Sequence, residues 1–192
     1  MVILIVGEFI FGLGDSLLIA AGVGNTPWTV LAEGIALTAE VWTIGEATFL
    51  VSIAVMFLWI PIKETPGIGT ILNIIIIALT IHVMVPILPQ TENFLVSILM
   101  ASSGILLVGI GSTMYLTANL GPGPRDGWMT GLQRATGVPI GRVRITIEFS
   151  VLVIGMVLGG TFGIGTILFA VTIGPVVASC LSIASRIDST TR

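Results

Sequence analysis

The amino-acid sequence predicts an all-α, polytopic membrane protein with six transmembrane helices in two inverted three-helix repeats, each containing a short re-entrant or interfacial helix. Three observations lead to this prediction. Of the 192 residues, 55% are hydrophobic and 9% are charged, which is typical of membrane proteins rather than of soluble domains. Six stretches are apolar enough to be spans. The hexapeptide GIGTIL occurs at residues 67–72 and again, half a chain later, at residues 163–168.

The six candidate spans are stretches with few charges. A membrane-spanning helix needs about 20 mostly apolar residues. The candidates are residues 2–22, 47–62 (completed by 43–46), 68–88, 94–120, 145–162 and 164–185. No charged residue occurs from Phe149 to Ser185, and one helix of that length would be almost twice as long as the hydrocarbon layer is thick. We therefore expect the chain to turn back at the glycine-rich residues 159–163.

Two further stretches, residues 27–42 and 124–136, have helical spacing of apolar residues but are too short and too charged to span. Each follows the first span of its half and begins at a proline, Pro27 or Pro124. Helices of this length are typically re-entrant or interfacial. We expect one membrane domain, with the first repeat at residues 1–90 and the second at residues 91–192.

The charge distribution predicts the orientation of the repeats. With three spans per repeat, the second repeat enters the membrane from the opposite side. In this topology one side receives all the basic residues, while the other receives Glu33, Glu40 and Glu92. The positive-inside rule makes the basic side the cytoplasm and places both termini there. The alternative, in which one short segment spans, would put basic residues on both sides. The basic residues are Lys63, Arg125, Arg134, Arg142, Arg144, Arg186 and Arg192.

Both short helices begin at clusters of glycine, asparagine and proline. Such clusters permit a sharp entry into a helix and leave free backbone N–H groups at its start, which attract anions. Broken helices at corresponding positions of two repeats also indicate substrate sites in transporters. The alternative is a tight interfacial turn in each half. The candidate substrate-binding residues are Gly24, Asn25, Pro27, Asn119, Gly121, Gly123, Arg125 and Asp126, with Arg125 expected to meet an anionic group.

Ionisable side chains inside apolar stretches are costly, so each needs a reason. Glu8 and Asp15 lie seven residues apart on the first span and therefore share one helix face. Together with His82 on the third span and Glu148 on the fifth, they are candidates for proton coupling. The alternative for each is structural: a hydrogen bond from a protonated acid for Glu8 and Asp15, a hydrogen-bonded imidazole for His82, and an ion pair with Arg144 for Glu148.

The string LGPGPRDGWMTGL at residues 120–132, followed by Arg142, Arg144, Glu148 and GGTFGIGTILFAVTIGP at residues 159–175, resembles the YczE/YitT-type family of bacterial inner-membrane proteins. The resemblance covers nearly the whole chain and is most specific in the second half. In the first half, the family usually has an aspartate after Pro-Trp, whereas this chain has Thr29, so Asp126 is the matching acid. The resemblance implies a multi-pass protein of the bacterial inner membrane that acts as a transporter or an accessory protein.

The remaining patterns exclude several function classes. No basic patch suits nucleic acid. One histidine and one cysteine make no His/Cys metal site, no P-loop follows the glycine-rich turns, and we expect no cofactor and no enzyme. Gly155, Gly159 and Gly163 suit close helix packing, either within the chain or in a homodimer. The expected partners are the lipid bilayer and a small solute.

The leading functional hypothesis is a secondary transporter of a small solute, with an anionic solute and coupling to protons as its more specific forms. The alternative is a non-transporting accessory protein that binds a membrane or biosynthetic enzyme. An integral membrane enzyme ranks third, because no nucleophile or metal constellation is visible.

Overall fold

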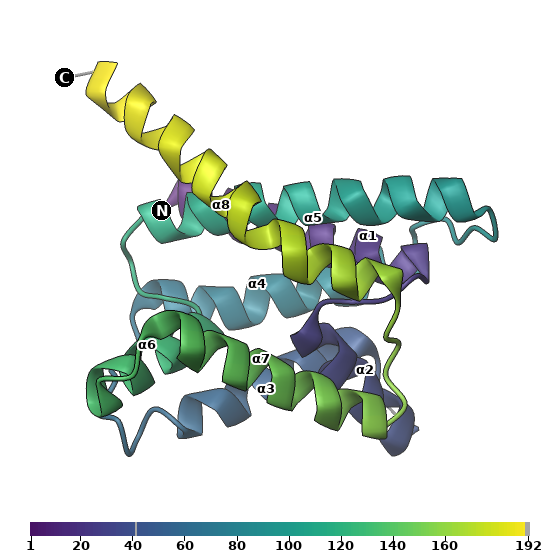
Figure 1. Cartoon of the computed structure of the whole chain (residues 1–192), viewed down its shortest axis with the longest axis horizontal. Coiled ribbons are helices and arrows are strands. Elements are labelled where there is room, and N and C mark those ends of the chain that lie inside the picture. Colours follow the sequence, from purple (N-terminus) through teal and green to yellow (C-terminus); the bar gives the residue numbers. More distant parts are fainter. Residues whose placement is uncertain (41, 191–192) are drawn as a thin grey trace.

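The computed structural model describes residues 1–40 and 42–190, with side chains described up to Arg186, and all regular structure in these ranges is helical. This confirms the predicted all-α class. The helices are α1 (Val2–Ala21), α2 (Pro27–Ala39), α3 (Ile44–Phe57), α4 (Ile68–Met84), α5 (Phe94–Thr117), α6 (Pro124–Thr136), α7 (Ile140–Val157) and α8 (Ile164–Thr190) (Figure 1).

Three of the described helices, α1, α5 and α8, are long and apolar enough to cross a membrane, and a fourth span exists if α2 and α3 together form one broken span. Helix α4 is apolar but has 17 residues, and the 18 residues of α7 include Arg142, Arg144 and Glu148. The described part of the chain therefore has three or four candidate membrane spans, whereas the arrangement of six spans in inverted repeats stays a prediction.

Four of the candidate spans, α3, α4, α5 and α7, end before their predicted limits, at Phe57, Met84, Thr117 and Val157 rather than at residues 62, 88, 120 and 162. The start of α3 is fixed by a capping box, in which the Glu46 amide donates to Thr43 Oγ1 at 3.2 Å and the Thr43 amide donates to the Glu46 carboxylate at 2.7 Å. Helix α7 begins directly after Pro139 rather than at residue 145, since the exposed Arg142 and Arg144 can remain in its first turns. The chain leaves the helical conformation at residues 158–163, as predicted.

Glycines bring α1 and α5 together. A Cβ built on Gly14 would lie 2.6 Å from the carbonyl oxygen of Gly104, and one on Gly111 would lie 2.5 Å from the carbonyl oxygen of Gly7. Such pairs allow two helix backbones to approach closely. Helix α1 also packs on α4, and α5 packs on α8; in these contacts Gly12 lies against the Thr80 side chain and Gly109 against the Val176 side chain.

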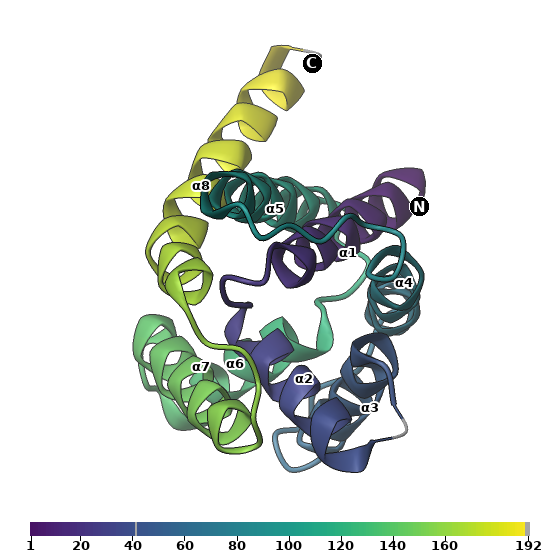
Figure 2. The same ribbon diagram turned by 90° about the vertical axis from the view of Figure 1, so that its right-hand side faces the viewer.

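Viewed along the long axis of the molecule, helices α8, α5, α1, α4, α3 and α7 follow one another around the outline, with α2 and α6 between α7 and α3 (Figure 2). Two large apolar clusters and a smaller one, formed by Ala32, Ala36 and Ala47, lie in the interior of the described part of the chain. One large cluster joins α1, α5 and α8 through residues such as Leu18, Ile105 and Phe169. The other large cluster joins α2, α3, α6 and α7 through residues such as Trp28, Val55 and Ile147.

The turns that follow α1 and α5 each accept a backbone hydrogen bond from the opposite half of the chain. The Gly165 amide at the start of α8 donates to the carbonyl of Val23, which follows α1, at 2.8 Å. The Gly69 amide at the start of α4 donates to the carbonyl of Leu120, which follows α5, also at 2.8 Å. The two GIGTIL sequences therefore occupy equivalent positions, and each receives the turn of the other half.

Glycine is required in these turns. Gly24 and Gly121 have φ values of 117° and 119°, a region that residues with a Cβ rarely adopt. A Cβ on Gly24 would also lie 2.6 Å from the Gly163 amide nitrogen, and a Cβ on Gly121 would lie 2.9 Å from the Gly67 Cα. Gly155 and Gly163 likewise pack against α2 and the preceding turn, so their spacing serves contacts within the chain, and the homodimer stays a prediction.

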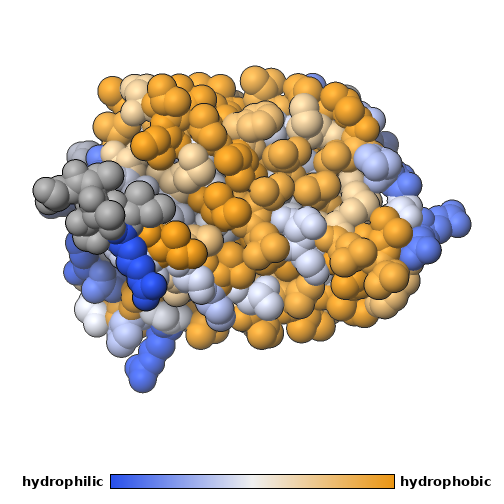
Figure 3. Space-filling view, turned by 90° about the horizontal axis from the view of Figure 1, so that it is seen from above, coloured by the Kyte–Doolittle hydropathy of each residue, from blue (hydrophilic) through white to orange (hydrophobic). Residues whose placement is uncertain are grey.

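The surface is divided into an apolar middle and hydrophilic ends. Hydrophobic residues cover most of the face in Figure 3, with hydrophilic residues toward its two ends. Large exposed hydrophobic side chains occur on α1, α4, α5, α7 and α8, among them Ile71, Leu99, Ile154 and Val171. A continuous apolar surface of this kind suits a lipid environment.

The glycine contact between α1 and α5 can be tested by stability. Gly104→Ala is expected to destabilise the protein by about 1–3 kcal/mol, because the added methyl group meets backbone that cannot move aside. Gly174→Ala is the matched control, since a Cβ there meets nothing within 4 Å. Thermal unfolding in detergent measures the difference. Equal midpoints for the two variants would contradict the close helix contact.

Candidate functional site

A cavity of about 100 Å³ lies between the two halves of the chain. The start of α2 contributes Thr26, Pro27 and Trp28 to its wall, and the start of α6 contributes Arg125 and Asp126. The remaining wall comes from α1, α5, α6, α7 and α8. We call this space the central cavity. Its other lining residues are Phe11, Val108, Ser112, Tyr115, Leu116, Met129, Arg144, Glu148, Phe169, Ile173 and Val177.

The start of α2 is tied to a buried acid on α1. Thr26 is the N-cap, and its hydroxyl accepts a hydrogen bond of 3.3 Å from the Thr29 amide. The hydroxyls of Thr26 and Thr29 share a hydrogen bond of 2.8 Å, and Thr29 donates to Asp15 Oδ2 at 3.1 Å. Asp15 and Thr29 are both fully buried. The chain thus places a carboxyl group directly behind the start of the short helix.

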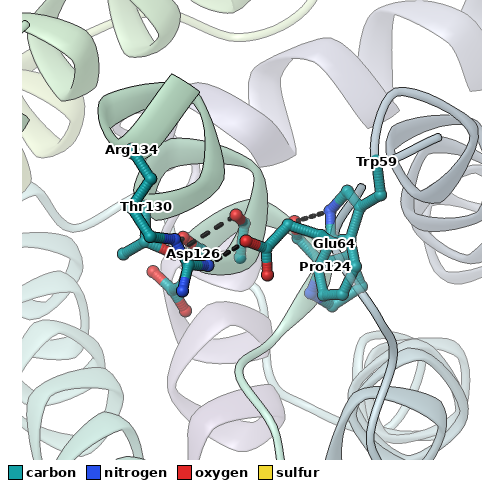
Figure 4. Close-up of polar contacts among 7 residues, drawn as sticks. Trp59, Glu64, Pro124, Asp126, Thr130 and Arg134 are labelled. Carbon is teal, nitrogen blue, oxygen red and sulfur yellow. Dashed lines mark hydrogen bonds and ion pairs between the residues drawn. The ribbon is translucent and has the colours of Figure 1, made fainter. Parts of the chain in front are cut away.

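The start of α6 is fixed by aromatic residues from other elements. The Trp59 indole N–H donates to the carbonyl of Pro124 at 3.0 Å, and Gly127 lies against the Trp59 ring. The Tyr115 hydroxyl of α5 donates to the Asp126 carboxylate. At the other end of α6, Arg134 pairs with Glu64 in the α3–α4 connection (Figure 4).

Arg125 lies at the centre of the charged groups. Its guanidinium carbon is 5.2 Å from the centre of the Trp28 ring, a distance at which a cation is attracted to the aromatic face. It also interacts electrostatically with carboxylates on three elements, namely Asp15, Asp126 and Glu148. Glu148 in turn accepts a hydrogen bond of 2.9 Å from Arg144, so the ion pair considered from the sequence is present.

Several buried polar atoms on α1 and around the start of α2 have no hydrogen-bond partner within 3.5 Å among the described residues. They include both carboxylate oxygens of Glu8, Asp15 Oδ1, Asn25 Oδ1 and Trp28 Nε1. Glu8 is fully buried and faces Asn73 of α4. A buried polar group that lacks a hydrogen bond is unfavourable by about 1–3 kcal/mol. Their concentration on α1 and the start of α2 therefore marks this region as one able to bind water, protons or a polar ligand.

A second cavity, of about 700 Å³, opens at the α2 end of the molecule and is lined by residues that include Glu33, Glu40 and His82. We call it the outer cavity. The Glu33 carboxylate accepts hydrogen bonds from Asn25 Nδ2 at 2.9 Å, from the Thr161 amide at 2.7 Å and from the Thr161 hydroxyl at 2.8 Å. Asn25, which Glu33 binds, directly precedes Thr26 in the wall of the central cavity. Glu33 therefore connects the lining of the outer cavity to the turn beside the central cavity.

The structure brings some of the candidate residues together and separates others. Pro27, Arg125, Asp126 and Glu148 line the central cavity, and Asp15 interacts with Arg125. Glu8 lies on the same helix, toward Asn73. Asn25 is buried beside Glu33. Gly24 and Gly121 form the turns packed on the opposite half, and Gly123 precedes α6 next to Asn73.

Two candidates lie elsewhere. Asn119 is exposed in the turn after α5, with a φ of 51°, so its role there is conformational. His82 is exposed and its Nδ1 hydrogen-bonds the Thr43 hydroxyl at 2.9 Å. It lines the outer cavity rather than the central one.

Other residues of the site were not singled out from the sequence. Trp28 and Tyr115 line the central cavity, and Glu33 links Asn25 to Thr161. Tyr115 is the one tyrosine of the chain, and a buried tyrosine generally needs a partner for its hydroxyl, so its place in an apolar span was a usable signal. The Glu33 contact depends on residues 128 positions apart, for which the sequence contains no signal.

Helices with an apolar exterior, hydrophilic ends and a small charged interior define an integral membrane protein. A model of a family of unknown function, DUF6198, matches residues 1–182, and the chain belongs to this family. It is 44% identical over 185 residues to an uncharacterized protein of Haemophilus influenzae, a match that covers 96% of this chain and 84% of the relative.

The chain is also 33% identical over 173 residues to the uncharacterized membrane protein YczE of Bacillus subtilis, covering 88% of this chain and 79% of that protein. The resemblance to YczE-type proteins is thus confirmed. No solved structure matches the chain.

The contact between Asp15 and α2 is open to a direct test. Thr29→Val keeps the shape of the side chain and removes the hydroxyl that donates to Asp15 Oδ2. We expect a loss of stability of about 1–3 kcal/mol, measured by thermal unfolding in detergent. Thr146→Val, at an exposed position of α7, is the control. If both variants unfold at the wild-type temperature, Thr29 does not support Asp15.

Proposed function

We propose that the protein is a secondary transporter of a small solute in the bacterial inner membrane, with both termini in the cytoplasm. Its substrate site is the central cavity. The observation that carries the proposal is that the starts of two broken helices, one from each half of the chain, line the same small cavity together with Arg125 and Asp126. In transporters built from repeats, substrates bind at such paired helix starts.

In this proposal the two halves, residues 1–90 and 91–192, are inverted three-span repeats. Two features support this arrangement. The contacts between halves are reciprocal, because the turn after α1 binds the start of α8 and the turn after α5 binds the start of α4. In addition, α6 lies at the end of the molecule where the N-terminus lies, and α2 lies at the opposite end (Figure 1). The shorter α3, α4 and α7 would cross with their adjoining turns, where the bilayer can adjust its thickness.

Asp15 and Glu8 are proposed to carry the coupled protons. A buried carboxyl group avoids an uncompensated charge by binding a proton. Asp15 faces Thr29 of α2 and Arg125 of α6, while Glu8 faces Asn73 of α4. Proton binding at Asp15 would weaken its attraction to Arg125 and so alter the link between α1 and α6. Glu148, paired with Arg144 at the cavity, and His82, at the outer cavity, are secondary candidates.

Two sets of polar contacts are proposed to keep the central cavity closed. At the α2 end, Glu33 binds Asn25 and Thr161. At the α6 end, Arg134 binds Glu64. The first contact joins α2 to the connection between α7 and α8, and the second joins α6 to the connection between α3 and α4. Each short helix is thus bound to the opposite half of the chain. Release of one set at a time would expose the cavity to one side of the membrane, which is what alternating access requires.

The transport proposal predicts uptake into proteoliposomes driven by a pH gradient. With a pooled metabolite extract as the source of solute, Asp15→Asn and Glu8→Gln are expected to abolish the gradient-driven part of uptake, because neither amide can bind and release a proton. Glu92→Gln, at an exposed position before α5, should transport like the wild type. No flux for any protein variant, together with stable co-purification of an enzyme partner, would favour the accessory role instead.

The inverted arrangement predicts that the far ends of α2 and α6 face opposite sides of the membrane. Single cysteines at Glu40→Cys and Arg134→Cys, in a Cys180→Ser background, are both at exposed positions. A membrane-impermeant thiol reagent added outside intact cells should label the first and not the second. Labelling of both from one side would contradict the inverted repeats.

A further inference from the structure

Aromatic rings from four helices surround the central cavity. Phe11 of α1, Trp28 at the start of α2, Tyr115 of α5 and Phe169 of α8 all belong to its wall. The rings of Phe11 and Tyr115 meet edge to face, with their centres 6.3 Å apart. Aromatic rings around a small space, next to carboxylates, are the chemistry by which proteins recognise ammonium ions.

One cation already uses this chemistry. The Arg125 guanidinium lies over the Trp28 ring at 5.2 Å and interacts with Asp15, Asp126 and Glu148. Arg125 is thus a tethered cation held between an aromatic face and several carboxylates. The site accommodates a positive charge within the protein itself.

The charge balance of the cavity opposes an anionic ligand. Its lining contains two basic side chains, Arg125 and Arg144, and two acidic ones, Asp126 and Glu148. Arg144 is bound to Glu148 at 2.9 Å, and Asp15 adds a further carboxyl group beside Arg125. No positive charge is therefore left in surplus for an anion, whereas ionised Asp15 would leave a negative surplus for a cation.

We propose that the central cavity binds a small organic cation, an alkylammonium ion of a few non-hydrogen atoms, between the aromatic rings and the carboxylate of Asp126, with the buried Asp15 adding a further negative charge beside Arg125. This inference names the substrate class of the proposed transporter and rests on that function for its physiological meaning. The volume of about 100 Å³ lies well below the range of about 300–1,000 Å³ that is usual for drug-sized ligands. This proposal replaces the anionic solute group that the sequence led us to expect at Arg125 with a cationic solute.

Binding to the full-length protein in detergent tests the proposal. Methylammonium and tetramethylammonium chloride are titrated by calorimetry, with sodium acetate and sodium phosphate as anionic probes and sodium chloride at matched ionic strength. We expect saturable binding of at least one alkylammonium ion and none of either anion. Trp28→Leu should weaken cation binding about tenfold or more, since it removes an aromatic face from the site.

Asp126→Asn provides an independent variant, because the amide can still accept the Tyr115 hydrogen bond but has no charge. It should also weaken cation binding about tenfold, as loss of a nearby opposite charge does in a dry site. Trp42→Leu, at an exposed tryptophan outside the central cavity, is the matched control and should bind like the wild type. Thermal unfolding without probe shows which variants are folded.

The outcomes separate the two proposals. Saturable acetate or phosphate binding without alkylammonium binding overturns the cation site. Unchanged alkylammonium binding in folded Asp126→Asn or Trp28→Leu overturns it as well. Alkylammonium binding that is weakened in both folded variants supports the site even if proteoliposomes show no flux, in which case the transport proposal fails. Uptake of another solute without any alkylammonium binding retains transport and refutes the cation class.

Discussion

The architecture depends on a requirement of the lipid environment, which is that the backbone groups of a broken helix must find partners inside the protein. The chain leaves the helical conformation after α1 and after α5, and each break is met by the glycine-rich start of a helix from the other half. Gly165 binds the Val23 carbonyl and Gly69 binds the Leu120 carbonyl. These bonds fix where α2 and α6 begin, and so the position of the central cavity between them.

The charged side chains around the central cavity determine which ligand charge it suits. The N-terminal ends of α2 and α6 would suit an anion, but the carboxylates of Asp15, Asp126 and Glu148 surround the one arginine that could bind it. The Thr26 hydroxyl caps the start of α2, whereas α6 has no side-chain cap and has the carboxylate of Asp126 in its first turn. The lining of the cavity therefore combines aromatic rings with balanced acidic and basic side chains.

The sequence was sufficient to predict features that depend on local chemistry. Composition and long apolar stretches gave the all-α class, proline with glycine gave the starts of α2 and α6, and the glycine-rich residues 159–163 gave the break that the structure has at 158–163. Features that depend on folding were out of reach, such as the bond of Glu33 to Thr161 and the stacking of Arg125 on Trp28. Asn119 was chosen as part of the glycine–proline cluster and His82 as a possible proton relay, but Asn119 lies in the exposed turn after α5 and His82 lines the outer cavity. The Thr43 capping box fixes the start of α3.

The reciprocal bonds between GIGTIL and the opposite turn also bear on how such a chain could arise. A polypeptide of half this length would expose the Gly69 amide and the Val23 carbonyl without the groups that satisfy them here. It could complete these bonds only by pairing with a second copy of itself. In this chain each half supplies to the other the groups that a second copy would supply, while the two halves differ in side chains such as Thr29 in one and Asp126 in the other.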